Sequence, residues 1–335
     1  MTSASFTEQL ANLPTVDVMY FVIAATLIRL SLIHLRIVAG RPWAEFIESA
    51  VIAVVLVFLL IRPFVVKAYF IPSPSMVPTL LGKNGSGDRI LVNNLAYRLG
   101  SPHHDNVVVF IPPPQATEGS TDEEPPGVPI VFIKRLIAEP GDVIQVKAGR
   151  IMVNSQEFSH YYLRRKLIES NYFGNDSMEP DTQADHHIKF TKNAVLVDQQ
   201  PIPNTKIAEM LTSMPDAKVR IEPGETILNG HVLDEPFIAE DPDYDMQLYK
   251  GQPLKFDPQA GDSNYRYDGV AISKEEYDLD HASAPEALPP HTYFMMGDNR
   301  NDSKDSTEWG PLDVQHVVGK AQFIFWPLTR IRAIH

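Results

Sequence analysis

Two serines, Ser73 and Ser75, lie in a segment that closely spaced prolines make rigid. The segment Tyr69–Leu81 reads YFIPSPSMVPTLL, and its prolines favour extended or turn backbone. A rigid backbone fixes the direction in which both hydroxyls point. A serine hydroxyl becomes a good nucleophile only when a nearby base removes its proton. A proline-braced linker whose serines have no chemical role would show the same pattern.

A lysine that can supply such a base lies in the segment Ile130–Asp142, which reads IVFIKRLIAEPGD. In a strand, Lys134 shares one face with Phe132 and Leu136. Apolar neighbours remove hydration from an amine and lower its pKa, by up to about 3–5 units in documented burials. A neutral amine near pH 7 can act as a general base. The alternative is an edge-strand lysine whose amine reaches solvent.

A third segment, Tyr293–Ser306, combines an apolar strand with a polar turn and reads YFMMGDNRNDSKDS. Asp298 can pair with Arg135, and Ser303 can orient a nearby amine. An ordinary polar turn is the alternative interpretation. The three segments together supply a hydroxyl, a base and groups that can hold them.

Signatures of other hydrolases and of metal sites are missing from the sequence. It has neither a G-x-S-x-G elbow nor an H-E-x-x-H helix, and Pro78 stands where an S-x-x-K motif at Ser75 would need lysine. The absence of cysteine excludes thiolate chemistry and cysteine-bound metals. The run His103-His104-Asp105 is more typical of a solvated turn than of metal ligands. We therefore expect no metal and no cofactor.

The three segments resemble those of the bacterial type I signal peptidases, membrane-bound Ser–Lys serine proteases that remove signal peptides from secreted preproteins. The matching motifs, in the family's order, are IPSPSMVPTL at 71–80, KR with PGD at 134–135 and 140–142, and GDNRNDSKDS at 297–306. The resemblance implies an endopeptidase that cleaves secretory preproteins after small residues, at A-x-A-like sites.

The resemblance also implies roles for the residues of the first two motifs. Ser75 matches the nucleophile, and Lys134 matches the general base. The hydroxyl of Ser73 and the backbone N–H of Ser75 match the oxyanion hole. Shallow apolar substrate pockets are implied, with a lining of Tyr69, Ile71, Met76, Leu80, Phe132 and Ile133.

The third motif matches residues that support this pair. Ser303 matches a serine that hydrogen-bonds the lysine amine, Asp298 and Arg135 match a structural ion pair, and Asp305 matches a supporting acid. The arginine that often follows the supporting acid by two residues is Thr307 here, so Asp305 needs another partner. Two other departures are His103-His104 where the family usually has Arg-Gly, and Ala138-Glu139 before Pro140.

Two apolar stretches near the N-terminus predict membrane helices that would carry these segments. Phe46–Val66 is long enough to cross about 30 Å of hydrocarbon, and a buried core helix is the alternative. Val16–Val38 is less uniformly apolar, so an interfacial amphipathic helix is its alternative. Basic residues between the two stretches place their connection in the cytoplasm. We expect a multi-pass protein of the cell membrane whose catalytic domain is extracytoplasmic.

The rest of the chain predicts a mainly β fold: an antiparallel β-sheet catalytic domain with an inserted subdomain of ribbons and loops. The division we expect is an N-terminal tail, first helix and connection (1–45), a second helix (46–66), a split catalytic domain (67–150 and 286–335) and an insertion (151–285). Pro112–Pro129 predicts a mobile surface loop. Alternating runs bounded by turn residues predict strands at Arg89–Val92, Asn106–Ile111, Ile130–Ile137, Val143–Val146, Tyr293–Met296 and Ala321–Trp326.

The net charge of the chain indicates which classes of binding partner suit it. The formal net charge of −13 argues against a nucleic-acid partner, so we expect preproteins and the lipid bilayer instead. Two other functions fit less well. A self-cleaving Ser–Lys repressor would be a soluble DNA-binding protein, and a membrane-anchored β scaffold or inactive paralogue would not need Ser75 together with Lys134. The oligomeric state is left open.

Overall fold

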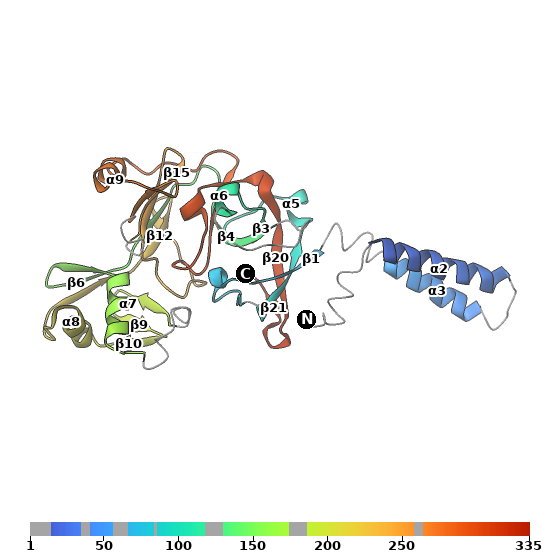
Figure 1. The fold of residues 1–335 in the computed structure, drawn as a ribbon, viewed down its shortest axis with the longest axis horizontal. Helices are drawn as coiled ribbons and strands as arrows, with labels where there is room; N and C mark the ends of the chain where they lie inside the picture. The colour runs from blue at the N-terminus through green and yellow to red at the C-terminus, as the bar shows by residue number, and fades with distance from the viewer. Residues whose placement is uncertain are drawn as a thin grey trace.

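The computed structural model describes residues 15–34, 41–55, 66–83, 86–117, 130–173, 186–257 and 264–335. Figure 1 shows a pair of helices that lies apart from a strand-rich body. Helices α2 (Thr15–His34) and α3 (Arg41–Val55) pack side by side. Between them, Arg29 donates a hydrogen bond of 2.6 Å to Glu48.

The two predicted membrane spans are only partly covered by these helices. Helix α2 covers most of the first span, Val16–Val38, whose residues 35–38 lie outside the described residues. Helix α3 contains the beginning of the second span, Phe46–Val66, whose residues 56–65 lie outside the described residues. Among the helices in the described ranges, none is both long enough and apolar enough to cross a membrane.

An antiparallel sheet of eight strands contains the strand of Lys134 and the strand that leads into the polar turn. The serine segment follows the first strand of this sheet. Its strand order is β1-β2-β20-β3-β4-β18-β19, with β21 paired to β20. The six predicted strands are confirmed within a few residues, and β20 begins four residues earlier than predicted. The strands of this sheet are β1 (Val66–Phe70), β2 (Arg89–Asn93), β3 (Val107–Phe110), β4 (Phe132–Ala138), β18 (Thr292–Met296), β19 (Leu312–Asp313), β20 (Val317–Trp326) and β21 (Arg332–Ala333).

A second antiparallel sheet, of seven strands, packs against the first. Its order is β13-β12-β5-β14-β15-β16-β17. Side chains such as Ile137 and Phe294 from the first sheet share one apolar cluster with Ile144 and Met246 from the second. The strands are β5 (Ile144–Lys147), β12 (Glu225–Leu228), β13 (His231–Val232), β14 (Asp245–Tyr249), β15 (Gln252–Phe256), β16 (Tyr265–Tyr267) and β17 (Val270–Ala271).

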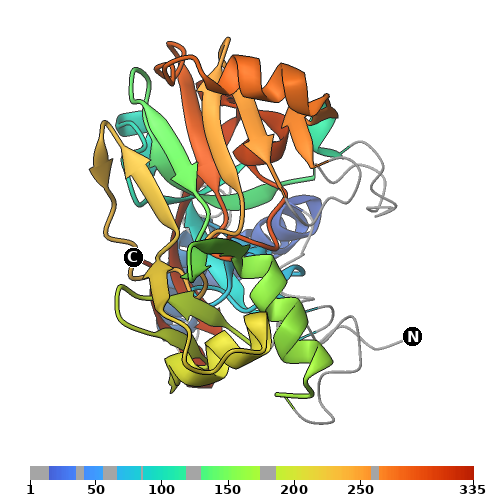
Figure 2. The same ribbon diagram turned by 90° about the vertical axis from the view of Figure 1, so that its left-hand side faces the viewer.

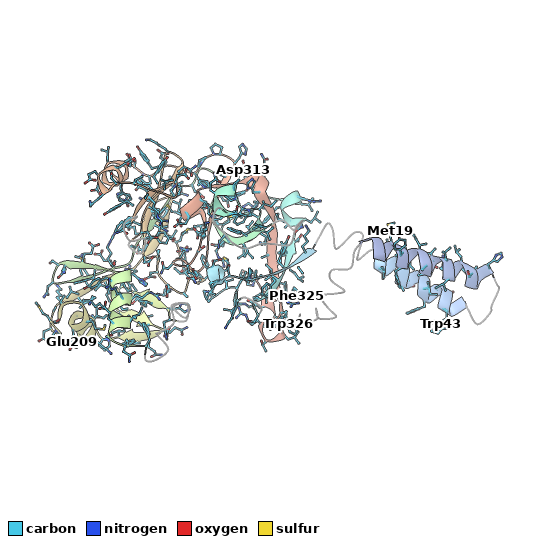
Figure 3. The ribbon with its side chains drawn as sticks, viewed as in Figure 1. Met19, Trp43, Glu209, Asp313, Phe325 and Trp326 are labelled. Carbon is cyan, nitrogen blue, oxygen red and sulfur yellow. The ribbon has the colours of Figure 1, made fainter. Side chains whose placement is uncertain are left out.

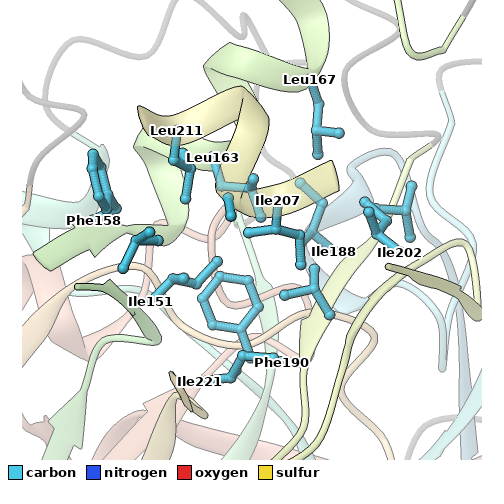
Figure 4. Close-up of a cluster of buried hydrophobic side chains, with 14 residues drawn as sticks. Ile151, Phe158, Leu163, Leu167, Ile188, Phe190, Ile202, Ile207, Leu211 and Ile221 are labelled. Carbon is cyan, nitrogen blue, oxygen red and sulfur yellow. The ribbon is translucent and has the colours of Figure 1, made fainter. Parts of the chain in front are cut away.

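Residues 150–173 and 186–222 form a small subdomain with its own apolar core, shown in Figure 4. Two three-stranded sheets, β10-β9-β8 and β11-β6-β7, pack with helices α7 and α8. Figure 2 shows these two helices at one end of the body and α9 (Lys274–His281) at the other. The elements are β6 (Arg150–Val153), β7 (Gln156–Ser159), α7 (His160–Glu169), β8 (Ile188–Phe190), β9 (Val195–Val197), β10 (Gln200–Ile202), α8 (Asn204–Thr212) and β11 (Val219–Glu222).

The insertion differs from the predicted ribbons and loops because its described residues include three helices of eight to ten residues. Leu163 and Leu167 on α7, like Ile207 and Leu211 on α8, are buried four residues apart. Such pairs mark one face of a helix, but over two or three turns they form too short a pattern to stand out in the sequence. The tertiary core, rather than helix length, stabilises these helices.

The small subdomain leaves and rejoins the body at one narrow point. A Cβ on Gly149 would lie 3.2 Å from the backbone nitrogen of Gly224, and one on Gly224 would lie 3.0 Å from that of Gly149. Glycine at both positions lets the two backbones approach each other. The later strands of the insertion, β12 to β17, belong to the seven-stranded sheet instead, and α9 packs against β14, β15 and β16 of that sheet.

Short helices complete the body. They are η3 (Pro74–Met76), α5 (Ala96–Leu99), α6 (Pro114–Thr117), α10 (Ser306–Trp309), η7 (Val314–His316) and η8 (Leu328–Arg330). Helix α6 lies in the predicted loop Pro112–Pro129, and its Ala116 is buried against Trp309 and Phe110. Residues 118–129, the rest of that loop, lie outside the described residues.

Candidate active site

Ser75 lies in the single turn of η3, directly after the bend that the prolines impose. The side chains of Met76 and Leu80 are completely buried and anchor this turn in an apolar cluster. Ser75 itself is 7% exposed, and its Oγ lies 3.4 Å from the Oγ of Ser73, with either hydroxyl able to donate. The exposed Ser73 and the buried Ser75 therefore form a pair of neighbouring hydroxyls at the surface of the body.

Lys134 lies on β4, where it pairs with Val108 of β3, and it is only 4% exposed. Strand β4 directly contacts η3, the helical turn that carries Ser75. Within the described part of the chain, no hydrogen bond joins the Lys134 amine to the hydroxyl of Ser75 or Ser303. The amine and the Ser75 hydroxyl therefore lie in neighbouring elements without a direct bond.

Burial lowers the pKa of Lys134 to about 8, because an ammonium loses its hydration there. The carboxylates of Asp305, Asp302 and Asp298 oppose this shift in that order, since they favour the charged form. Exchange between ammonium and neutral amine near pH 8 is what a general base for a serine hydroxyl requires.

The polar turn, residues 297–306, holds the serine segment through its backbone. The Asn299 N–H donates to the Ser75 carbonyl at 3.1 Å, and the Asn299 side chain donates to the Pro74 carbonyl at 3.3 Å. A Cβ on Gly297 would lie 2.5 Å from the Ser75 carbonyl oxygen and 2.3 Å from the Ser303 Oγ. Only glycine at 297 lets Ser75 and Ser303 approach this closely.

Ser303 points its hydroxyl into the protein without a partner. Its Oγ is buried and makes no hydrogen bond among the described residues. An unpaired buried hydroxyl is costly, so such groups are rare and often mark a functional site. This hydroxyl is available to an amine, as the sequence predicts, although no bond to Lys134 is formed.

The pair Arg135 and Asp298 is present as a completely buried, two-bond ion pair. Arg135 Nε donates to Asp298 Oδ1 at 2.8 Å, and its Nη2 donates to Oδ2 at 2.7 Å. Arg135 also donates to the carbonyls of Asp105 and His335, and Thr79 donates to Asp298. These bonds join β4, the polar turn and the serine segment, so the pair fixes the strand next to Lys134.

Asp305 finds its partners close by in the sequence rather than in an arginine. Its carboxylate accepts hydrogen bonds from the Gly297 N–H at 2.8 Å, the Thr307 N–H at 3.0 Å and the Thr307 hydroxyl at 2.9 Å. Asp305 thereby caps the N-terminus of α10 and closes the polar turn on itself. Thr307, which replaces the usual arginine, supplies two of these three bonds.

Five of the six predicted pocket residues gather in one place. Ile71, Met76 and Leu80 belong to the cluster against which Tyr69 and Ile133 pack. Phe132 faces the other way, packs against the cluster that contains Phe110 and Trp309, and so lies apart from the other five. The alternation of side chains along β4 explains this split between neighbouring residues.

Sequence reasoning missed the residues that hold the polar turn from behind. Arg300 is buried and donates to Glu235 and Thr226, and Phe237 lies next to Arg135. Arg300 and Asn299 stood within a motif that was recognised, so their position could have indicated a role. Glu235 and Phe237 lie in the weakly patterned insertion, where no sequence signal distinguished them.

Comparison with known proteins places the chain in a family. The sequence profile described as "Signal peptidase, peptidase S26" matches residues 43–207 and 193–326. The chain is 25% identical over 293 residues to Signal peptidase I of Leptolyngbya laminosa, covering 88% of this chain and 84% of that protein. It is 27% identical to Signal peptidase I of Aquifex aeolicus (strain VF5), over 84% of this chain and 89% of the other. With Signal peptidase I of Mycobacterium tuberculosis (strain ATCC 25618 / H37Rv) it shares 28% identity, over 85% and 73%.

The profile match extends over most of the chain and includes all three motif segments. A self-cleaving repressor and a non-enzymatic scaffold are therefore set aside. The chain belongs to the signal peptidase family, peptidase S26, and is a serine endopeptidase of the signal peptidase I type.

Proposed function

We propose that this enzyme cleaves N-terminal signal peptides from secretory preproteins, with Ser75 as nucleophile and Lys134 as general base. The observation that carries the proposal is the buried Lys134 on β4, a strand that contacts η3, the turn that carries the buried Ser75. A base of this kind needs neither histidine nor aspartate, because desolvation alone makes the neutral amine accessible.

In the proposed reaction the Lys134 amine removes the Ser75 hydroxyl proton while the oxygen attacks the scissile carbonyl carbon. Negative charge then develops on the former carbonyl oxygen. The Ser73 hydroxyl and the Ser75 N–H are the proposed donors to this oxyanion, and loss of one such donor typically costs about 10²–10³ in rate. The Lys134 ammonium next protonates the leaving amine, and water hydrolyses the acyl-enzyme. Ser303, through its free hydroxyl, orients the amine between these steps.

The pairing of β4 supports an extended substrate beside the catalytic lysine. Strand β3 pairs with β4 from Phe132 to Arg135, whereas β18 pairs with it only from Arg135 to Ala138. The second edge of Phe132–Lys134 thus has no partner strand in the described part of the chain. A preprotein segment can add there as a strand, and its small side chains can lie over the partly buried Tyr69 and Ile133, which pack on the cluster of Ile71, Met76 and Leu80.

Exposed apolar side chains support action at a bilayer. Trp326 is 48% exposed at the end of β20, and Phe323, Leu328 and Ile331 nearby are also exposed. Figure 3 shows Phe325 and Trp326 on the side of the body that faces α2 and α3. Signal peptidase I enzymes are membrane-anchored. We propose that Val16–Val38 and Phe46–Val66 anchor this chain and that the body lies on the extracytoplasmic surface.

The test uses the full chain in detergent, a preprotein with an A-x-A site, and mass spectrometry of the new N-terminus. We expect cleavage after the second small residue by the wild type and none by Ser75→Ala or Lys134→Ala. Circular dichroism shows whether each variant is folded. Cleavage by either folded variant at close to the wild-type rate would exclude the proposed dyad.

A further inference from the structure

One loop of the insertion lies directly behind the polar turn. This bridging loop, residues 233–244, connects β13 to β14 and carries a run of buried acidic residues. It is far from the serine segment in sequence, and its nearest strands belong to the seven-stranded sheet. Its contacts with the polar turn are nevertheless more specific than apolar packing.

The first contact is a buried ion pair between Glu235 and Arg300. Both Nη atoms of Arg300 donate to the Glu235 carboxylate, one of them at 3.0 Å, and Thr226 accepts a further bond at 2.6 Å. Arg300 Nε donates to the Gly297 carbonyl at 3.1 Å. The arginine therefore connects the bridging loop to the residue whose close approach to Ser75 requires glycine.

The second contact is the ring of Phe237. The Arg135 guanidinium carbon lies 3.9 Å from its centroid, and that of Arg300 lies 6.0 Å away. Two buried cations therefore face one ring, an arrangement favoured by the negative face of the aromatic system. Glu235 neutralises one of these cations and Asp298 the other. Loss of either carboxylate leaves a buried positive charge beside the site.

The third contact is made by Asn301. Its side-chain nitrogen donates to Glu240 at 3.1 Å and to the Asp241 carbonyl at 2.9 Å, and its oxygen accepts from the Asp243 N–H at 3.0 Å. Glu240 also pairs with Arg164 on α7 of the small subdomain. The polar turn is thus attached to the insertion at Arg300 and again at Asn301.

One further hydrogen bond connects these two attachments to the nucleophile, Ser75. Asn299, adjacent to Arg300, donates its backbone N–H to the Ser75 carbonyl at 3.1 Å. A displacement of the turn therefore displaces Ser75 relative to Lys134. A shift of about 1 Å in a reacting group can cost about 10² in rate.

We infer that the bridging loop is part of the catalytic apparatus and that Glu235 is a positioning residue that acts on Ser75 through Arg300. This inference rests on the proposed Ser75–Lys134 function. It assigns to the insertion a catalytic task, the alignment of the nucleophile, in addition to any structural one.

Glu235→Gln keeps the shape of the side chain and removes its charge. We expect kcat for preprotein cleavage to fall about 10- to 100-fold, with KM changed less than threefold, because no atom of Glu235 contacts substrate in the proposed arrangement. Since the effect passes through Arg300, the double variant Glu235→Gln/Arg300→Gln should be no slower than Arg300→Gln alone.

Two controls separate positioning from general loss of stability. Glu222→Gln removes the carboxylate of an exposed ion pair with Arg220 on the same insertion and should leave kcat unchanged. Leu163→Ala destabilises the core of the small subdomain and should lower the melting temperature without lowering kcat at temperatures where it is folded. If Glu235→Gln does not fold, Asn301→Ala, which detaches the turn at its second attachment, should lower kcat about three- to tenfold.

The inference is overturned if folded Glu235→Gln, or folded Asn301→Ala in its place, keeps the wild-type kcat. It is also overturned if Leu163→Ala loses kcat in the same proportion as its stability. Failure of the proposed function looks different: the wild type itself would not cleave, or Ser75→Ala would cleave. The assays on the wild type and on Ser75→Ala thus distinguish the two failures.

Discussion

The small subdomain and the region around the polar turn have opposite interiors. Within the described residues, the core of the subdomain is built from aliphatic and aromatic side chains, and His160 is its one buried polar residue. Around the polar turn the buried residues include Lys134, Arg135, Asp298 and Arg300. The first interior resembles that of any small folding unit, in which apolar burial stabilises the chain. The second concentrates charges that are costly to bury and are therefore arranged in pairs.

This difference separates residues that make the fold from residues that make the site. An apolar core tolerates changes of side chain provided that volume and pattern are kept. A buried charge network tolerates little, because removing one member leaves its partner unpaired. Substitutions should therefore affect stability in both regions but should affect catalysis almost exclusively around the polar turn.

The largest expected effect is on catalysis by the dyad. Ser75→Ala and Lys134→Ala should each lower kcat by at least about a thousandfold, and the double variant should be no slower, because nucleophile and base act as a unit. Quenched-flow or long-time preprotein assays can measure such rates. Independent, multiplying effects of the two substitutions would show that they do not act in one step.

The second largest effect is expected on the free energy of unfolding when the buried ion pair of Arg135 and Asp298 is broken. Asp298→Ala leaves the Arg135 guanidinium unpaired in the interior, so we expect a loss of about 3–5 kcal/mol in the free energy of unfolding. Glu222→Ala breaks the pair with Arg220, whose side chains are 47% and 68% exposed, and should cost at most about 1 kcal/mol. Urea unfolding of both variants measures the contrast, and equal losses would contradict it.

Leu163→Ala tests the subdomain core by itself. Removal of a completely buried leucine side chain should cost about 2–5 kcal/mol. Because, among the described residues, the apolar cluster around Leu163 contains no residue of the bridging loop or of the polar turn, kcat of the folded variant should remain within twofold of wild type. A separate unfolding transition at lower temperature in calorimetry would show that the small subdomain unfolds independently of the region around the polar turn. A large drop in kcat would contradict this separation.

The pH dependence tests the charges around Lys134. With a pKa of about 8, the active neutral amine is lost as pH falls through that value, so kcat/KM should rise with pH and level off above it. Asp302 is exposed and favours the ammonium form, so Asp302→Asn should lower the pKa and move the rise to lower pH. The remote exposed Asp216 provides a control, since Asp216→Asn should leave the profile in place. A profile equally insensitive to both changes would mean that Lys134 is not the titrating base.

The smallest effect is expected in the proline-rich acidic segment. Replacing residues 118–129 by a Gly/Ser linker should leave kcat/KM within twofold, because that composition supplies no apolar pattern for a core. Ala116 just before it is buried against Trp309 and is excluded from the replacement. A folded replacement variant with lost activity would show that the segment contacts substrate.

The sequence by itself determined the local elements and the identity of the chemical groups. Alternating apolar residues predicted the six strands, because burial of one strand face repeats every two residues. The prolines predicted a rigid backbone for the serine segment. The position of Lys134 between Phe132 and Leu136 predicted an amine that has lost hydration, and burial does lower its pKa. The ion pair of Arg135 with Asp298 was predicted from their opposite charges and from the family resemblance, and it is present in the structure.

Only the tertiary structure decided how the insertion meets the site. Glu235, Phe237 and Glu240 lie in a stretch without period or motif, yet they contact Arg300, Arg135 and Asn301. The tertiary structure also decided on which side of β4 Phe132 packs. It showed in addition that Thr307, which stands in place of an arginine, is the partner of Asp305. The contacts of Glu235, Phe237 and Glu240 could not be predicted because they join residues about 60 to 100 positions apart through single side chains. Local propensity and periodicity report a residue's own neighbours along the chain, whereas pairing between distant side chains depends on the completed fold.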